Sequence, residues 1–269
     1  MPRPDRELLG ALKIARLATH VVVGLGLSAA VFPWVGARGR GACFRWWSRR
    51  ILAILAVRPR MHGQWEALPA DTPRLLVSNH VSWLDIFVIR SAVACRFVAK
   101  SEIRRWPLVG WLVSRQGTVF VERARRQDTG RVNATLQAAL RGGDAVVVFA
   151  EGTTSDGSRL NPFHGSLLQP LVDLGGLALP VALRYAGADG AINLEASYAG
   201  DRSLWQSVRL LAAQREIVVD LHLLTPVDAA GRHRRELARH CAERVAEALR
   251  LPPPDRAPGR LPGPPDAAP

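Results

Sequence analysis

The sequence predicts an α/β protein in which a central mixed sheet is covered by helices and an N-terminal apolar or amphipathic helical segment anchors the chain in a membrane. Three observations predict this arrangement. From Met61 onward, short runs rich in Val and Leu alternate with helical segments, as in α/β folds. The preceding segment is apolar and basic, and the tail after Leu251 is rich in Pro, Gly and Ala, as disordered tails are. We therefore divide the chain into an anchor (1–60), an α/β domain (61–251) and a tail (252–269).

The anchor combines apolar segments with strong positive charge. No Asp or Glu lies between Glu7 and Glu66. The basic residues in this interval are Lys13, Arg16, Arg38, Arg40, Arg45, Arg49, Arg50, Arg58 and Arg60. Segment 17–37 is uncharged and about long enough to cross a bilayer. Segment 44–55 mixes arginines with Trp and aliphatic residues, as interfacial helices do. A span and a hairpin that enters one leaflet both fit, because basic residues on both sides leave the positive-inside rule undecided.

Two other interpretations of the first apolar segment are less favoured. A signal peptide has a shorter apolar core and a small-x-small cleavage site, so a retained anchor fits better. The run 24–29 matches the dinucleotide-binding pattern GxGxxA. That pattern needs an acidic residue about twenty positions later to bind the ribose, and this stretch has none.

Composition limits the possible functions without choosing among them. A chain of 269 residues, 48% of them hydrophobic, can bury a substantial core. The net charge of +13 indicates an anionic partner, which could be nucleic acid, anionic lipid or a phosphorylated small molecule. Cys43, Cys95 and Cys241 show no paired spacing, so neither a disulfide framework nor a zinc site is indicated.

The alternation after Met61 predicts individual strands and helices. The expected strands are 75–78, 96–99, 118–122, 145–149, 177–183 and 217–223. The expected helices are 84–93, 108–114, 127–141, 167–174, 204–214 and 234–251. In open α/β sheets, ligands bind where strands end in loops, so the residues that follow these strands are candidates for the functional site.

The first such junction carries His80 and Asp85. Histidine exchanges protons near neutral pH, and a nearby carboxylate can fix its tautomer and stabilise its cation. On one continuous helix, residues five apart lie about 140° out of register. The two side chains can meet if His80 lies in the loop and Asp85 in the first turn of the next helix, with Ser82 as N-cap. The alternative is structural, since Ser82-x-x-Asp85 also resembles a capping box.

Three further clusters follow strands of the domain. Arg123, Arg125 and Arg126 follow one strand, and Gly117 precedes it. The run 150–157, Ala-Glu-Gly-Thr-Thr-Ser-Asp-Gly, follows another. A little later the run 161–166, Asn-Pro-Phe-His-Gly-Ser, precedes a helical segment, and Pro180 interrupts the next apolar run. Each cluster alone has an ordinary interpretation, as solvated surface, as a turn or as a strand edge.

Together these clusters resemble the four ordered blocks of the glycerolipid acyltransferases. The blocks are Asn79-His80 with Asp85, Gly-Thr-Val-Phe-Val-Glu-Arg at 117–123, Phe-Ala-Glu-Gly-Thr-Thr-Ser at 149–155, and Ala-Leu-Pro-Val-Ala at 178–182. That family includes bacterial 1-acylglycerol-3-phosphate acyltransferases and their lyso-ornithine-lipid relatives. The resemblance spans 75–183, which is most of the soluble domain.

The resemblance implies a reaction and a set of residues. His80 would be the general base that deprotonates an acceptor hydroxyl, and Asp85 would orient it. The donor would be acyl-CoA or acyl-carrier protein, with no cofactor, no metal and no acyl-enzyme intermediate. The absence of a GxSxG nucleophile elbow from the sequence agrees with this.

The resemblance also implies residues that bind the acceptor. Arg123 with the turn Glu151-Gly152-Thr153 would hold its polar head, because guanidinium groups and turn N–H groups both bind phosphate. Asn79, Lys100, Gly117 and Thr154 complete the expected binding residues. Pro180 would shape the pocket.

Two departures from the family pattern affect the choice of acceptor. The third block usually reads Phe-Pro-Glu-Gly-Thr-Arg-Ser, whereas Ala150 and Thr154 stand here in place of the proline and the arginine. His164 stands where a lysine often precedes Gly165. We expect lysophosphatidate as the leading acceptor, giving phosphatidic acid. The alternative is lyso-ornithine lipid, because these variants resemble enzymes that acylate lyso-ornithine lipids, whose head group carries an amine and a carboxylate.

The expected protein is therefore an enzyme of phospholipid biosynthesis at the cell inner membrane, with its active site on the cytoplasmic side. A basic nucleic-acid-binding protein would explain the charge, but the aromatic residues concentrate in the apolar anchor rather than on a basic platform. A non-catalytic membrane adaptor would explain the anchor but would leave the four blocks without a purpose.

Overall fold

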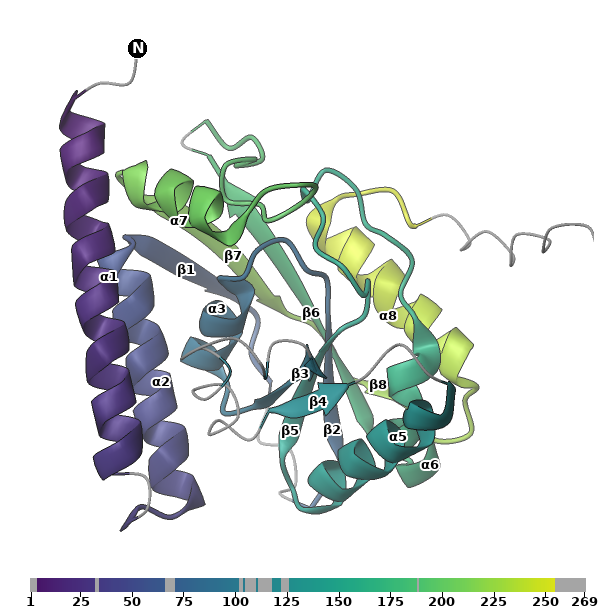
Figure 1. The fold of residues 1–269 in the computed structure, drawn as a ribbon. Coiled ribbons are helices and arrows are strands. Elements are labelled where there is room, and N and C mark those ends of the chain that lie inside the picture. Colours follow the sequence, from purple (N-terminus) through teal and green to yellow (C-terminus); the bar gives the residue numbers. More distant parts are fainter. Residues whose placement is uncertain are drawn as a thin grey trace, which may run out of the picture.

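The computed structural model describes residues 4–31, 34–65, 71–101, 104, 110, 118–121, 126–187 and 189–254. Two long helices come first, α1 (Pro4–Ala30) and α2 (Ala37–Ile54), and they lie side by side against a domain of one sheet flanked by helices (Figure 1). The later helices are α3 (Asp85–Ala92), α5 (Arg126–Arg141), the 3-10 turn η3 (Gly165–Leu168), α6 (Gln169–Leu174), α7 (Leu204–Ala213) and α8 (Arg234–Leu249).

Within the described residues, eight strands form one mixed sheet. Its strands are β1 (Val57–His62), β2 (Arg74–Ser78), β3 (Arg96–Lys100), β4 (Val119–Val121), β5 (Ala145–Phe149), β6 (Leu177–Ala186), β7 (Ile217–Leu223) and β8 (Val227–Asp228). Their order is β1-β7-β6-β2-β5-β3-β4, with β8 paired to β6. The run from β6 to β4 is parallel, whereas β7 is antiparallel to β6. This confirms the α/β class and the mixed sheet that the sequence predicts.

Both faces of the sheet are buried under helices. Successive strand residues point to opposite faces, so neighbouring residues join different core clusters. Leu75 and Val77 of β2 join one core cluster, with α5, α6 and α8, while Leu76 joins the other, with α2, α3 and α7. The buried Val and Leu runs of β2 and β5 are typical of parallel strands covered on both sides.

The structure differs from the sequence-based expectation in two strands and in one turn. Strands β1 and β8 are not among the expected strands: β1 lies at the sheet edge, contains a proline and buries only Val57, and β8 has two residues. Strand β1 begins inside the segment 1–60, so residues 57–60 belong to the sheet. The expected helix 167–174 is a 3-10 turn followed by α6. Of the expected helix 108–114, only Gly110 lies within the described residues.

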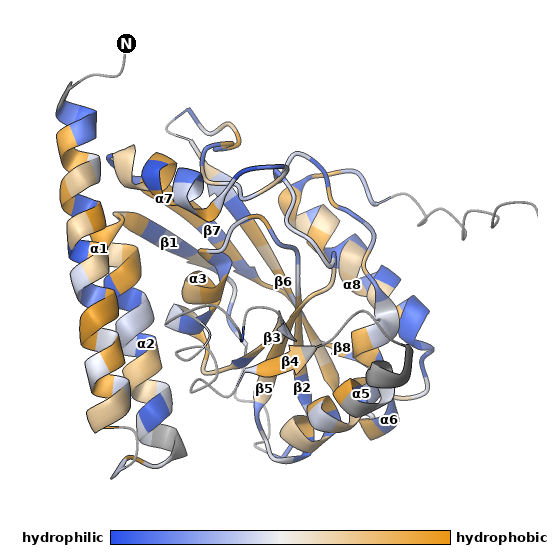
Figure 2. Ribbon diagram, in the orientation of Figure 1, coloured by the Kyte–Doolittle hydropathy of each residue, from blue (hydrophilic) through white to orange (hydrophobic). Residues whose placement is uncertain are grey.

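Helix α1 has its apolar face outside. The residues that it buries are small or polar, namely Gly10, Lys13, His20, Gly24 and Ser28. Its exposed residues include Leu8, 75% exposed, and Val22, 66% exposed. Figure 2 shows apolar colours along much of this helix. Within the described residues, 5–30 is the one helical stretch long and apolar enough to cross a membrane.

Helix α1 is fastened to the domain by polar contacts. The ammonium of Lys13 donates to the backbone oxygens of Leu55, at 3.1 Å, and Gln214, at 2.6 Å. These two residues are the C-caps of α2 and α7, where the helix dipoles favour a cation. Farther along, the ring of His20 stacks on that of Trp47 in α2, with centroids 5.4 Å apart. Helix α1 is therefore held to two different helices along its length.

Candidate functional site

The site lies where β2 and β5 end side by side. The two strands are parallel, and Ser78 of β2 pairs with Phe149 of β5. The loop after β2 carries Asn79 and His80, and the loop after β5 carries Glu151. Because the carboxyl ends of parallel strands meet at one edge of the sheet, two segments about seventy residues apart come together there.

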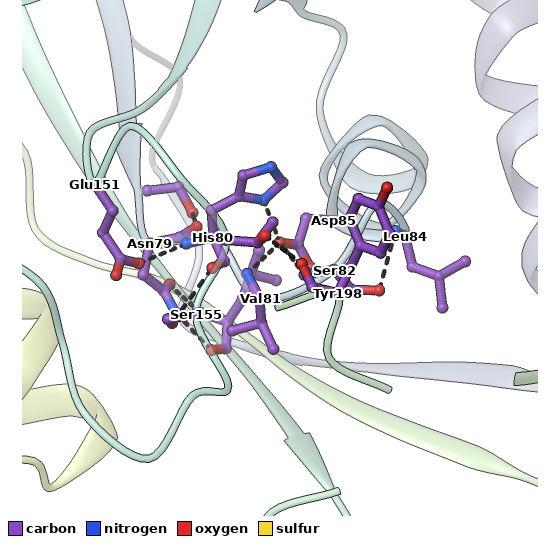
Figure 3. A network of polar contacts seen from close by, with 12 residues as sticks. Asn79, His80, Val81, Ser82, Leu84, Asp85, Glu151, Ser155 and Tyr198 are labelled. Carbon is purple, nitrogen blue, oxygen red and sulfur yellow. Dashed lines mark hydrogen bonds and ion pairs between the residues drawn. The ribbon is translucent and has the colours of Figure 1, made fainter. Parts of the chain in front are cut away.

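The structure brings His80 and Asp85 together. Nδ1 of His80 lies 2.8 Å from Oδ2 of Asp85 (Figure 3). His80 lies in the loop and Asp85 is the first residue of α3, as the sequence-based geometry requires. A carboxylate can only accept here, so Nδ1 carries the proton and Nε2 of the neutral ring has the free lone pair. The Asp85 side chain is fully buried, whereas that of His80 is 19% exposed.

The backbone of the loop also binds Asp85. Its Oδ2 accepts hydrogen bonds from the N–H groups of Val81, at 2.8 Å, and Ser82, at 3.0 Å. The bond from Ser82 is one half of a capping box. The other half is missing, because the Ser82 hydroxyl accepts from the N–H of Leu84 instead, and Leu84 is the N-cap of α3. The expectation that Ser82 caps α3 is therefore wrong, while Asp85 serves the helix start and the histidine together.

Tyr185 is a site residue that sequence reasoning missed. Its hydroxyl donates to Oδ1 of Asp85 at 2.7 Å from strand β6. Burial and the charge of Asp85 raise the pKa of the Tyr185 hydroxyl well above its usual value, so it remains a neutral donor. Its signal in the sequence is weak, because a tyrosine at the end of an apolar strand is usually a core residue.

Glu151 holds the backbone of the loop that carries His80. Its Oε1 accepts from the N–H of His80 at 2.8 Å, and its Oε2 accepts from the N–H and the side-chain amide of Asn161, at 3.1 and 2.8 Å. The N–H of Ser155 donates to the carbonyl oxygen of His80 at 2.8 Å. Burial raises the pKa of Glu151, and the hydrogen bonds from His80 and Asn161 partly oppose that rise. In this structure the Glu151 carboxylate thus binds protein groups.

Asn79 also binds the protein itself. Its side chain accepts from the N–H of Leu183 at 2.8 Å and donates to the carbonyl oxygen of Leu183 at 2.9 Å. These two bonds extend the pairing of β2 with β6 by one residue beyond the strand. The Asn79 side chain is almost fully buried, and its contacts fix the start of the loop.

Four of the remaining expected binding residues lie in the turn after β5 or at the end of β3. Gly152 takes a positive φ of 75°, a conformation that favours glycine, in the turn after β5. Thr153 is exposed, and the hydroxyl of Thr154 donates to the backbone oxygen of Tyr198. Lys100 is the last residue of β3, and β3 is the neighbour of β5 in the sheet.

Gly117 and Arg123 lie outside the described residues. The strand between them, β4, stands two places from β5 in the sheet. Their expected role stays a prediction. No group of three or more His, Cys, Asp or Glu side chains within the described ranges has an arrangement that could hold a metal ion.

Several known proteins that are similar to this chain are acyltransferases. A family model described as Acyltransferase matches residues 58–184. A lyso-ornithine lipid O-acyltransferase of Pseudomonas aeruginosa is 37% identical over 249 residues, covering 88% of this chain and 92% of that protein. A 1-acyl-sn-glycerol-3-phosphate acyltransferase of Neisseria gonorrhoeae is 36% identical over 156 residues, covering 58% of this chain and 61% of that protein.

A solved structure has the same fold. The crystal structure of the 1-acyl-sn-glycerophosphate acyltransferase PlsC from Thermotoga maritima superposes with a TM-score of 0.70. It covers 93% of this chain and 97% of that chain at 24% identity, so the likeness concerns the fold alone. The match to the family model and the 37% identity to a relative of nearly equal extent lead to one conclusion: the chain belongs to the acyltransferase family.

Proposed function

We propose that this protein is an O-acyltransferase that moves a fatty acyl group from a thioester to the free hydroxyl of a lysolipid, with His80 as general base. The observation that carries the proposal is the His80–Asp85 pair, in which Asp85 binds Nδ1 and Nε2 points away from it (Figure 3). Within the described residues, no group hydrogen-bonds Nε2. An acceptor hydroxyl can therefore donate its proton to that atom.

The reaction follows from this arrangement. The acceptor hydroxyl gives its proton to Nε2 as its oxygen attacks the carbonyl carbon of the thioester. The tetrahedral intermediate collapses by breaking the C–S bond, and the leaving sulfur takes the proton back from the imidazolium. Asp85 stabilises the imidazolium between the two transfers, because its buried carboxylate faces Nδ1. The products are the acylated lipid and a free thiol, and no residue of the chain is acylated.

The donor is an acyl-CoA or an acyl-carrier protein. Both present the same thioester, and the net charge of +13 favours either, since one carries phosphates and the other is an acidic protein. The acyl thioester is the second substrate, and the proposed chemistry requires no cofactor.

Lyso-ornithine lipid is the acceptor that we now place first, ahead of the lysophosphatidate expected from the motifs. Relatives of this name from Pseudomonas aeruginosa and Brucella abortus are 37% and 34% identical and each cover at least 88% of this chain. Thr154 supports the same choice. It stands where the family pattern has an arginine, and its hydroxyl is bonded to the backbone of Tyr198, so it offers no cation to a phosphate. Lysophosphatidate remains the second acceptor.

We also propose that α1 lies in one leaflet of the cell inner membrane, with the active site on the cytoplasmic side. Its outward apolar face, with Leu8, Leu12 and Val22, suits contact with lipid chains. A helix that crossed the bilayer would have to leave the domain, whereas Lys13 fastens α1 to both α2 and α7. Such an anchor would bring the site beside its lipid acceptor.

Among the other expected binding residues, Arg123 and Lys100 remain the proposed contacts for an anionic group.

The test measures thiol release from acyl-CoA by the purified full-length protein in detergent, with lyso-ornithine lipid or lysophosphatidate as acceptor. We expect turnover with lyso-ornithine lipid that is lost in His80→Ala and kept in His240→Ala, which changes a half-buried histidine of α8. Near-normal turnover in His80→Ala would refute the mechanism. Faster turnover with lysophosphatidate would reverse the order of the acceptors.

A further inference from the structure

The ring of His80 lies flat against the ring of Phe149. Their centroids are 3.8 Å apart and the two planes differ by 10°. Phe149 is the last residue of β5, and it belongs to the sheet face that carries α3. The imidazole is thus in van der Waals contact with an aromatic face over its whole area, while Asp85 contacts it at one edge.

The two contacts restrict different rotations of the imidazole. A flat stack fixes the plane of the ring, and the one rotation that keeps the stack is a half-turn about the Cβ–Cγ bond, which lies in that plane. The half-turn would exchange Nδ1 with a carbon atom, and the 2.8 Å hydrogen bond to Asp85 excludes it. Phe149 and Asp85 together therefore determine the direction in which Nε2 points, and neither contact does so alone.

Phe149 also contacts a second aromatic ring. The ring of Phe97, on the neighbouring strand β3, stacks on it with centroids 6.0 Å apart and planes inclined by 24°. The guanidinium of Arg90 lies over Phe97 at 5.0 Å and over Phe44 of α2 at 5.4 Å. Arg90 is 4% exposed, so this cation is buried between the two aromatic faces. Phe149 is thus packed against two aromatic rings, those of His80 and Phe97.

We propose that Phe149 is a positioning residue for His80, and that its aromatic face stabilises the imidazolium that forms when His80 takes the proton of the acceptor. A cation against an aromatic face is attracted by the ring quadrupole, whereas the neutral imidazole gains much less. The contact is therefore stronger after proton transfer than before it, so it increases kcat without tightening substrate binding. This inference rests on the proposed function, in which His80 is the base.

The test compares Phe149→Leu, Phe149→Met and Phe149→Tyr with the matched control Phe163→Leu. Phe163 is a buried phenylalanine in the core cluster on the other face of the sheet. We expect kcat to fall about tenfold in the Leu and Met variants with KM unchanged, because both fill space without an aromatic face. We expect Phe149→Tyr to recover most of the loss, and Phe163→Leu to keep its kcat. The Met variant is the one to measure if the Leu variant does not fold.

A spectroscopic measurement tests the stack without any substrate. In the proton–carbon NMR spectrum of the imidazoles, the His80 signals are identified by their loss in His80→Ala. We expect the His80 carbon-bound protons to move downfield in Phe149→Leu, because they no longer lie over an aromatic ring, and to stay in place in Phe163→Leu.

The outcomes separate this inference from the proposed function. If His80→Ala keeps its turnover, the proposed function fails, and the inference fails with it. If His80→Ala is inactive but Phe149→Leu and Phe149→Met keep normal kcat, only the inference fails. Equal losses of kcat in Phe149→Leu and Phe163→Leu, or unmoved His80 signals in Phe149→Leu, would also overturn the inference.

Discussion

Tyr185 donates its hydroxyl hydrogen bond to Oδ1 of Asp85 at 2.7 Å, across 100 residues of sequence. Both side chains are buried, so no water competes for the bond. It occupies the oxygen of Asp85 that faces away from His80, and it leaves Oδ2 for the imidazole and the loop. The hydroxyl thus connects α3 and the loop that carries His80 to strand β6, whose backbone also binds Asn79.

We expect Tyr185→Phe to lower both stability and turnover. The change leaves Oδ1 of Asp85 buried without that donor, which costs about 1–3 kcal/mol in the free energy of unfolding. A carboxylate freed on one side can rotate, so we expect kcat to fall about tenfold. Chemical denaturation and thiol-release kinetics measure the two effects. Tyr198→Phe, which changes the other tyrosine of the chain, is the control. Unchanged kcat in Tyr185→Phe would mean that the hydroxyl does not orient Asp85.

Asp85→Asn should abolish most of the activity. Four donors converge on this carboxylate, from the ring of His80, the N–H groups of Val81 and Ser82, and the hydroxyl of Tyr185. An amide has one accepting oxygen, and its NH₂ group would oppose a donor or shift the histidine proton to Nε2. We expect kcat to fall about 10³-fold or more, because the base is then in the wrong tautomer. A variant that lost stability but kept kcat would reduce Asp85 to a helix-capping residue.

The sequence was sufficient to predict the central part of the fold and the contact between His80 and Asp85. Buried parallel strands such as β2 and β5 appear as short Val and Leu runs, so pattern alone locates them. His80 and Asp85 could be predicted to meet because a loop residue and the first residue of the next helix are neighbours whatever the rest of the chain does. Strand β1 could not be predicted, because its sequence Val-Arg-Pro-Arg-Met-His contains a proline and buries only Val57, and the strand is held by pairing with β7.

The roles of Glu151 and Tyr185 could not be read from the sequence, because they depend on contacts between distant segments. Glu151 was expected to hold the acceptor, yet its carboxylate faces the N–H of His80, seventy-one residues earlier. Such a contact is set by the register of β2 against β5. The stack of Phe149 on His80 has the same origin, since Ser78 and Phe149 are paired across the two strands.

Glu151→Gln should weaken the loop that carries His80. The two carboxylate oxygens accept three N–H bonds, one from His80 and two from Asn161. Glutamine has one accepting oxygen, so its NH₂ group would face a donor. We expect the free energy of unfolding to fall by about 1–3 kcal/mol, measured by chemical denaturation at neutral pH. Glu247→Gln changes an exposed glutamate of α8 and serves as the control. Equal stability of the two variants would contradict this role.

The pH dependence of stability provides a second test of Glu151. Burial raises its pKa in the folded state above the usual value of 4.5, which applies to the unfolded chain. Between those two values the folded protein holds a proton that the unfolded chain has released, so the free energy of unfolding decreases as pH rises through this window. We expect this decrease to disappear in Glu151→Gln, which cannot titrate. A profile parallel to that of the wild type would assign the decrease to another group.

Thr154→Arg should shift acceptor preference toward lysophosphatidate. The change restores the arginine of the family pattern in a half-buried position beside the loop of His80, and it removes the hydroxyl that binds the backbone of Tyr198. One charge-assisted hydrogen bond to a phosphate contributes about 1.5–3 kcal/mol. We therefore expect the ratio of kcat/KM for lysophosphatidate to that for lyso-ornithine lipid to rise about tenfold or more. Thr153→Arg adds the same charge at the exposed neighbouring position and should change the ratio much less. If both variants raise the ratio equally, general attraction of the anion explains it, and Thr154 does not select the acceptor.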